Sequence, residues 1–89
     1  MNILVTGATG FLGTVLCREL ERQQHSVVRV SSRTCDLRHP ESLHQFNGQS
    51  FDRLVHLAAW TQAGDFCLHH AGEQWIINQQ INTNVLTWW

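Results

Sequence analysis

Apolar runs at three places along the chain predict three short strands. Each run is continuous and rich in branched side chains, which is typical of a strand buried on both faces of a parallel sheet. The runs cover residues 2–6, 26–31 and 53–59. Residues 32–39 are polar and irregular, so a further strand between the second and third runs would be limited to Cys35-Asp36-Leu37.

Helical periodicity fills much of the chain between and after these strands. Residues 11–24 predict an amphipathic helix, since apolar side chains recur on one side and charged ones on the other. Pro40, favoured in a first helical turn, begins a short helix that Asn47-Gly48 ends. After a predicted loop over residues 60–72, the helical pattern resumes at Glu73 and continues to the last residue. The predicted apolar faces of the first and last helices are Leu12, Val15, Leu16 and Leu20, and Trp75, Ile77, Ile81, Val85 and Trp88 or Trp89.

The order of these strands and helices indicates the fold class. Strands that alternate with helical segments are the signature of a parallel sheet with helical crossovers. The sequence therefore predicts the α/β class, with a Rossmann-type parallel sheet and flanking helices. A chain of 89 residues accommodates one small domain or part of a larger one. We expect residues 1–89 to be incomplete, the N-terminal half of such a domain.

Composition and charge exclude several classes of protein. A net charge of −1 creates no field that favours nucleic acid or an anionic membrane. No stretch approaches the ~18 apolar residues that span a bilayer. The start of the chain lacks the basic flank and apolar core of a secretory signal. We therefore expect a cytoplasmic protein that binds neither nucleic acid nor membrane.

The spacing of cysteine and histidine gives no reason to expect a disulfide or a metal. The three cysteines are odd in number and widely spaced, at positions 17, 35 and 67, which predicts reduced thiols. Cys67, His69 and His70 form the best cluster for a metal, but no fourth ligand stands at a suitable spacing. No metal site is therefore predicted.

The segment that joins the first strand to the first helix carries three glycines. Gly7 allows a sharp turn off the strand, because glycine tolerates positive φ. Gly10 allows the backbone to approach a pyrophosphate, and Gly13 allows the helix to pack closely on the strand. The amides and the positive end of the helix dipole would then face the phosphates of a dinucleotide. A tight turn without a ligand is the alternative, and no lysine follows to make a P-loop. The candidate cofactor contacts here are Gly7, Thr9, Gly10, Phe11, Leu12 and Gly13.

Residues 6–13, T-G-A-T-G-F-L-G, resemble the glycine loop of the extended short-chain dehydrogenase/reductases. This is the NAD-dependent epimerase/dehydratase group, whose members act on nucleotide sugars with NAD(P). The resemblance covers essentially the whole chain, because three further segments match in order. The stretch after the second strand is nearest in pattern to GDP-fucose synthase-like members. The resemblance implies an oxidoreductase or isomerase with NADP or NAD as its cofactor.

The adenosine end of the cofactor is expected at the end of the second strand. That strand lacks the terminal carboxylate that binds the ribose hydroxyls of NAD. Arg33 is placed to meet a 2′-phosphate instead, with Ser31 and Ser32 as hydrogen-bond donors, which favours NADP over NAD. Asp36 and Leu37 match the pair that brackets the adenine in the family. A solvated Arg33 and a turn-forming Asp36 are the alternatives.

The nicotinamide end is expected at the end of the third strand. Residues 55–59 resemble the V-x-H-L-A-A segment of the family. The resemblance implies that Leu57, Ala58 and Ala59 border the nicotinamide ribose. His56 is then a packed strand residue rather than a catalytic acid or base.

One asparagine of the last helix completes the candidate site. Asn84 matches the cofactor-contacting asparagine of the family's N-x-x-G-T segment, although the residues after it depart from that pattern. The alternative is a polar helix face made of Asn78, Gln79, Asn82 and Thr83.

Catalysis in the family depends on a Tyr-x-x-x-Lys pair, in which tyrosine is the general acid/base and lysine lowers its pKa. The chain contains no tyrosine. The catalytic pair and the substrate domain are therefore absent, and we expect these 89 residues to be inactive. The predicted function is the NAD(P)-binding N-terminal part of a nucleotide-sugar epimerase, dehydratase or reductase, whose complete form is a homodimer. A non-catalytic NADP-binding regulator or sensor is the alternative.

Overall fold

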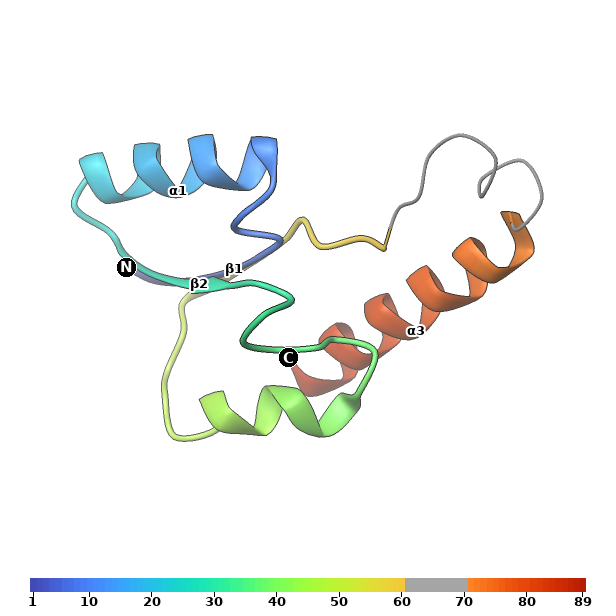
Figure 1. The fold of residues 1–89 in the computed structure, drawn as a ribbon. Coiled ribbons are helices and arrows are strands. Elements are labelled where there is room, and N and C mark those ends of the chain that lie inside the picture. Colours follow the sequence, from blue (N-terminus) through green and yellow to red (C-terminus); the bar gives the residue numbers. More distant parts are fainter. Residues whose placement is uncertain (61–70) are drawn as a thin grey trace.

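The computed structural model describes residues 1–60 and 71–89. Its elements in chain order are β1 (Asn2–Thr6), α1 (Phe11–Arg22), β2 (Ser26–Val30), the 3₁₀ helix η1 (Pro40–Phe46), β3 (Arg53–His56) and α3 (Ala71–Trp88). The strands form one parallel sheet in the order β2-β1-β3, so β1 is central. Helix α1 joins β1 to β2 on one side of the sheet, and η1 and α3 lie on the other side (Figure 1).

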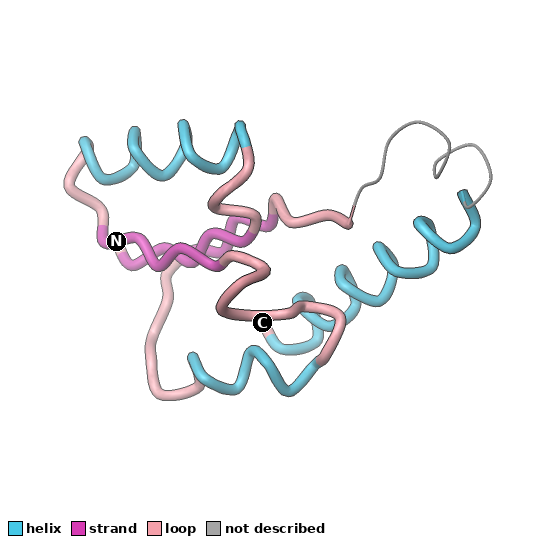
Figure 2. The backbone as a smooth tube through the Cα atoms, in the orientation of Figure 1, coloured by secondary structure: helices cyan, strands magenta, loops and turns pink. Residues whose placement is uncertain are grey.

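The sheet is covered on both faces, with the strands between two layers of helix (Figure 2). Successive side chains of a strand point to opposite faces. Accordingly, Ile3 and Val5 of β1 pack in a buried cluster with Cys17 of α1, whereas Leu4 belongs to a second cluster with Leu43 of η1 and Val85 of α3. This arrangement confirms the predicted Rossmann-type parallel sheet with flanking helices.

Two strands end earlier than their apolar runs predicted. β2 ends at Val30 and β3 at His56, because β1 ends at Thr6 and offers no partner beyond that residue. The amide of Leu57 still donates to the Thr6 carbonyl oxygen at 3.3 Å, and then the chain leaves the sheet. Residues 35–37, the one stretch available for a further strand, form none. The predicted strand bounds at 31 and 59 were therefore too long.

The inward face of α1 agrees only in part with the predicted one, since Leu20 packs against the core as predicted. Gly13 and Cys17 are buried, and Leu20 packs against the cluster that contains Cys17, whereas Leu12 and Val15 are exposed. The predicted face and the observed inward face both recur at helical spacing. The prediction was based on apolarity alone, so it chose the larger apolar side chains. A glycine allows the closest approach to the sheet, so the helix turns that side inward. The helix also ends at Arg22, two residues before the predicted end at position 24.

The helices on the other face match their patterns more closely. In η1, Leu43 and Phe46 both reach the core, because residues three apart share a side of a 3₁₀ helix. In α3, Ile81 and Val85 are buried as predicted, whereas Trp75 is 65% exposed and was wrongly assigned to that face. α3 begins at position 71 rather than 73. No helix in the described part of the chain has the length and hydropathy needed to cross a membrane.

Candidate functional site

A cavity of about 490 Å³ opens at the carboxyl edge of the sheet. Because the strands are parallel, all three end at this edge. The chain leaves β1 toward β2 and later returns to β3 on the other side of β1, so the strand order reverses beside β1. In open α/β sheets, ligands bind in the crevice outside such a switch point. The cavity therefore lies where this fold class holds its ligands.

The loop between β1 and α1 forms one wall of the cavity. Gly7 has a φ of +66°, and a Cβ on it would lie 2.8 Å from backbone atoms of Leu57 and Ala58. A Cβ on Gly13 would lie 2.0 Å from the Gly7 carbonyl oxygen. Gly10 differs, because a Cβ there would meet only that same oxygen, at an ordinary 3.5 Å. The fold therefore requires glycine at 7 and 13, whereas Gly10 leaves open space beside the cavity.

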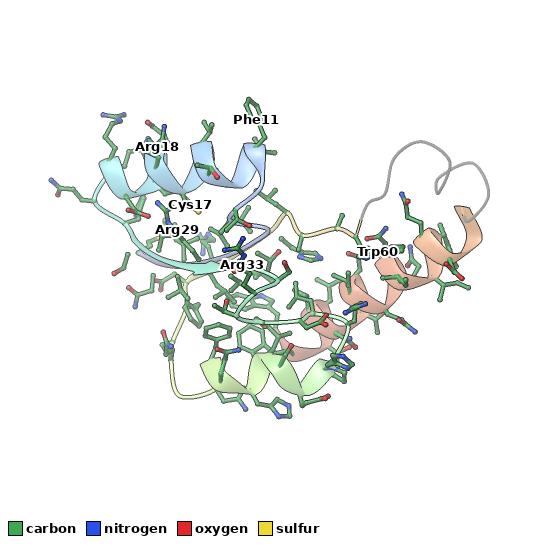
Figure 3. All side chains as sticks on the ribbon, in the orientation of Figure 1. Phe11, Cys17, Arg18, Arg29, Arg33 and Trp60 are labelled. Atoms are coloured by element: carbon green, nitrogen blue, oxygen red, sulfur yellow. The ribbon has the colours of Figure 1, made fainter. Side chains whose placement is uncertain are left out.

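The amino end of α1 adjoins this loop. Gly10 is the N-cap residue, no side chain caps the helix, and the first turn carries no acidic residue. Backbone amides of a first helical turn have no acceptor within the helix, and the helix dipole is positive there. The side chains of Phe11 and Leu12 are exposed, and Phe11 points away from the sheet (Figure 3). This helix end therefore offers uncapped amides, a setting suited to a phosphate.

The wall after β2 carries an ion pair between Asp36 and Arg38, and both residues border the cavity. Arg38 donates from Nη2 to Oδ2 of Asp36 at 2.7 Å. It also donates from Nε and from its backbone amide to Oδ1, at 3.0 and 3.1 Å. These hydrogen bonds stabilise the carboxylate and lower the pKa of Asp36 to about 2. At neutral pH Asp36 is thus an anion and a hydrogen-bond acceptor.

Two other elements hold the backbone of this wall. The Ser42 hydroxyl of η1 lies 2.7 Å from the Asp36 carbonyl oxygen. The side-chain amide of Asn84, in α3, donates to the carbonyl oxygens of Leu37 and Arg38 at 2.9 and 3.2 Å. Asn84 does not itself border the cavity. Its side-chain amide instead binds the backbone of the wall at Leu37 and Arg38.

The wall after β3 consists of residues 57–60. The Thr6 hydroxyl accepts hydrogen bonds from the amides of Leu57 and Ala58, at 3.0 and 3.1 Å. The Asn78 side chain of α3 accepts from the Trp60 amide at 2.7 Å and donates to the Trp60 carbonyl oxygen at 2.8 Å. Figure 3 shows Trp60 beside α3. This wall is thus fixed at both of its ends.

His56 lies behind this wall and does not border the cavity. Its Nδ1 is 2.6 Å from the Thr6 hydroxyl, and its Nε2 is 2.9 Å from the side-chain oxygen of Asn82. It therefore links β1, β3 and α3, as expected of a packed strand residue. Asn78 and Asn82, two members of the alternative polar helix face, make hydrogen bonds to Trp60 and His56.

The structure brings most of the predicted site residues together. Those that border the cavity are Gly7, Thr9, Gly10, Ser32, Asp36, Leu37, Leu57, Ala58 and Ala59. Those that do not border it are Phe11, Leu12, Gly13, Arg33 and Asn84. Arg33 is exposed on the loop after β2 (Figure 3).

Sequence reasoning missed several residues of the cavity, namely Val30, Cys35, Arg38, Trp60 and Ile81. Arg38 had a usable signal, because a cation two residues after the Asp36 carboxylate can pair with it in a turn. Trp60 had none, since it lies in a segment predicted only as a loop. The described residues hold no group of three or more His, Cys, Asp or Glu side chains arranged for a metal. Cys67, His69 and His70 lie outside the described residues.

Comparison with known proteins agrees with this geometry. Residues 3–89 match the NAD dependent epimerase/dehydratase family, so the chain belongs to this family. The spore coat polysaccharide biosynthesis protein SpsK of Bacillus subtilis (strain 168) is 32% identical over 78 residues, which are 86% of this chain and 27% of SpsK.

Solved structures show the same fold. A GDP-L-fucose synthetase from Naegleria fowleri bound to NADP aligns with a TM-score of 0.81 and 29% identity, over 97% of this chain and 28% of its own. A dTDP-4-dehydrorhamnose reductase from Clostridium acetobutylicum ATCC 824 aligns with a TM-score of 0.77 and 27% identity, over 94% of this chain and 30% of its own. The chain thus spans 27–30% of the length of these relatives.

Proposed function

We propose that the cavity binds NADP(H), with its pyrophosphate at the amino end of α1. The observation that carries the proposal is Gly10, which begins the helix without a side-chain cap and borders the cavity. Packing requires glycine at 7 and 13 but not at 10. A residue without a side chain at this point keeps space free that the protein itself does not fill. The helix amides and dipole then hold the phosphates.

The adenosine end of the cofactor lies at the loop after β2. Ser32 borders the cavity there, and Arg33 follows it. A guanidinium and a hydroxyl suit a 2′-phosphate, whereas NAD-binding proteins use a carboxylate at this point. The synthetase from Naegleria fowleri was bound to NADP, which supports NADP rather than NAD.

The nicotinamide end lies along residues 57–59, which border the cavity after β3. The bound cofactor supplies hydride transfer. We place the chain as the N-terminal, cofactor-binding part of a nucleotide-sugar reductase, epimerase or dehydratase. Relatives named for GDP- and dTDP-linked sugars support that substrate class. Because these 89 residues contain no tyrosine, we expect them to bind the cofactor without turnover.

Titration of the purified chain with NADPH and with NADH tests the site. We expect Gly10→Ala to weaken binding of both by at least about tenfold, because the added methyl group occupies the place of the pyrophosphate. Gly48→Ala is the matched control, since a Cβ there meets nothing within 4 Å. Circular dichroism establishes that both variants fold. Unchanged NADPH binding by folded Gly10→Ala would refute the proposed site.

A second variant tests the choice of cofactor. We expect Arg33→Met to lower the affinity for NADPH and leave that for NADH unchanged, because only NADPH carries the 2′-phosphate. Equal wild-type affinities for the two cofactors would refute the NADP assignment alone. Cofactor binding by the complete protein without turnover of any nucleotide sugar would instead support the regulator or sensor.

A further inference from the structure

Arg38 borders the cavity but has no part in the function proposed above. It uses three donors, two from the guanidinium and one from the backbone, on the carboxylate of Asp36. An ionised carboxylate has about four acceptor positions. The Nε2 atom of His39 lies 3.8 Å from Oδ2, too far for a hydrogen bond. About one acceptor position, on Oδ2, therefore stays available, which suits one N–H of an exocyclic amino group.

Leu37, the residue after Asp36, is also fixed in position. Leu37 is 7% exposed, and its carbonyl oxygen accepts from Asn84 at 2.9 Å. Asn84 belongs to α3, so this bond ties the wall after β2 to a helix 47 positions later in the chain. A purine stacked on Leu37 would meet an apolar surface that is fixed relative to the Asp36 carboxylate.

We propose that Arg38 and Asn84 are positioning residues that set a preference for adenine at this end of the cavity. The inference rests on the proposed binding of NADP(H). Arg38 orients Asp36 so that Oδ2 accepts from the amino group of adenine, and Asn84 keeps Leu37 against the ring. Neither positioning residue touches the base.

A direct contact between Arg38 and a cofactor phosphate is the competing arrangement. The Arg38 guanidinium is about half exposed and has donors that Asp36 does not use. A phosphate held there would compete with Asp36 for the same guanidinium. The two arrangements differ in what they recognise: one reads the base and the other reads the 2′-phosphate.

Binding of reduced nicotinamide hypoxanthine dinucleotide phosphate distinguishes these two arrangements of Arg38. The base of this dinucleotide carries a carbonyl oxygen where adenine carries the amino group and a hydrogen on the adjacent ring nitrogen N1, and the rest of the molecule matches NADPH. The ratio of its Kd to that of NADPH measures the adenine preference, and the ratio of the NADH and NADPH Kd values measures phosphate recognition. We expect the wild-type adenine preference to be at least about tenfold, the size of one charge-assisted hydrogen bond.

Arg38→Met is the decisive variant. We expect the adenine preference to fall to within about threefold of parity while the NADH-to-NADPH ratio stays unchanged. Arg38→Lys should restore only part of the preference, because an ammonium group lacks the planar fork that fixes both carboxylate oxygens. Asn84→Ala should lower the preference in the same way. Arg53→Met, an exposed arginine of β3 away from the cavity, should change neither ratio.

Several outcomes would overturn the inference. If Arg38→Met lowers phosphate recognition and leaves the adenine preference intact, Arg38 contacts the phosphate directly. If Arg38→Lys restores the full preference, charge and not orientation is what Arg38 supplies. Binding of NADPH with no adenine preference in any variant defeats this inference alone, whereas absence of dinucleotide binding defeats the proposed function itself.

Discussion

The hydroxyl of Thr6 lies 2.6 Å from Nδ1 of His56, where β1 and β3 end side by side. The same hydroxyl accepts from the amides of Leu57 and Ala58, so both of its lone pairs are used. It must therefore donate its proton to His56, which in turn carries its own proton on Nε2 and donates to Asn82 at 2.9 Å. His56 thus joins the sheet edge to α3 through both of its ring nitrogens.

Replacing Thr6 by valine should destabilise the protein by about 1–3 kcal/mol. Valine keeps the shape but leaves the amide of Ala58 and Nδ1 of His56 without partners, and stranded polar groups of this kind cost about that much. Urea unfolding followed by circular dichroism measures the change. Thr6→Ser is the control, because it keeps the hydroxyl and loses one methyl group, at a cost of about 1 kcal/mol. Equal losses for both variants would mean that the hydroxyl contributes nothing specific.

Gly13 should tolerate no side chain at all. A Cβ there would sit 2.0 Å from the Gly7 carbonyl oxygen, so α1 and the glycine loop would have to separate. We expect Gly13→Ala to cost at least about 2 kcal/mol through overpacking. Gly48→Ala, with open space around its Cβ, should stay within about 0.5 kcal/mol of the wild type. Thermal unfolding compares the two, and a Gly13→Ala melting point equal to that of Gly48→Ala would contradict the packing described here.

The glycine loop was predictable because its chemistry is local. Gly10 and Gly13 act through the turn and helix that contain them, Gly7 takes its positive φ in the same turn, and the spacing is visible in the sequence. Arg38 stands two residues after Asp36, which is a local signal for pairing, whereas Asn84 acts through a long-range contact that the sequence does not show. The direction of a side chain in the irregular loop after β2 follows no period, and the bond from Asn84 to Leu37 joins positions 47 apart.

The same limit explains the errors in α1 and α3. Leu12 and Gly13 lie on neighbouring sides of the helix. The helical spacing of residues in the sequence is therefore equally consistent with either side facing the sheet. Only the fit of the helix to the glycine loop selects the side of Gly13. Trp75 similarly follows the apolar spacing of α3 but lies beyond the part of that helix that the core covers.

The ion pair of Asp36 and Arg38 should stabilise the fold in a defined pH range. The pKa of Asp36 falls from 3.8 to about 2 because the Arg38 guanidinium favours the charged carboxylate. A lowered pKa gives stability that is present above the unfolded value and is lost as pH falls through 3.8 toward 2. Both side chains are more than a third exposed, at 36% and 49%, so screening keeps the contribution below about 1 kcal/mol.

Asp36→Asn measures this contribution. The difference in unfolding free energy between the variant and the wild type should be constant from neutral pH down to about 5 and should shrink at lower pH. Urea titrations at a series of pH values give that difference. A difference that grows as the pH is lowered would reverse the sign argued here.

Cys17 should be inert toward thiol reagents while the protein is folded. Its side chain is fully buried between α1 and the sheet (Figure 3). This burial raises the pKa of the thiol, although the nearby Arg29 guanidinium opposes the rise. Because the thiolate is the reactive form, Cys17 can be modified only after local or global unfolding exposes it. We expect the rate with an aromatic disulfide reagent at mildly alkaline pH to fall far below that of the urea-unfolded chain.

The variant Cys35→Ala/Cys67→Ser isolates the signal of Cys17, because it removes the other two thiols. Modification that is as fast in native buffer as in urea would show that α1 does not stay closed over the sheet. The same assay also reports on the cofactor, since a ligand that binds only the folded state lowers the population of open molecules. NADPH should therefore slow the modification further, and in Gly10→Ala that additional protection should be lost.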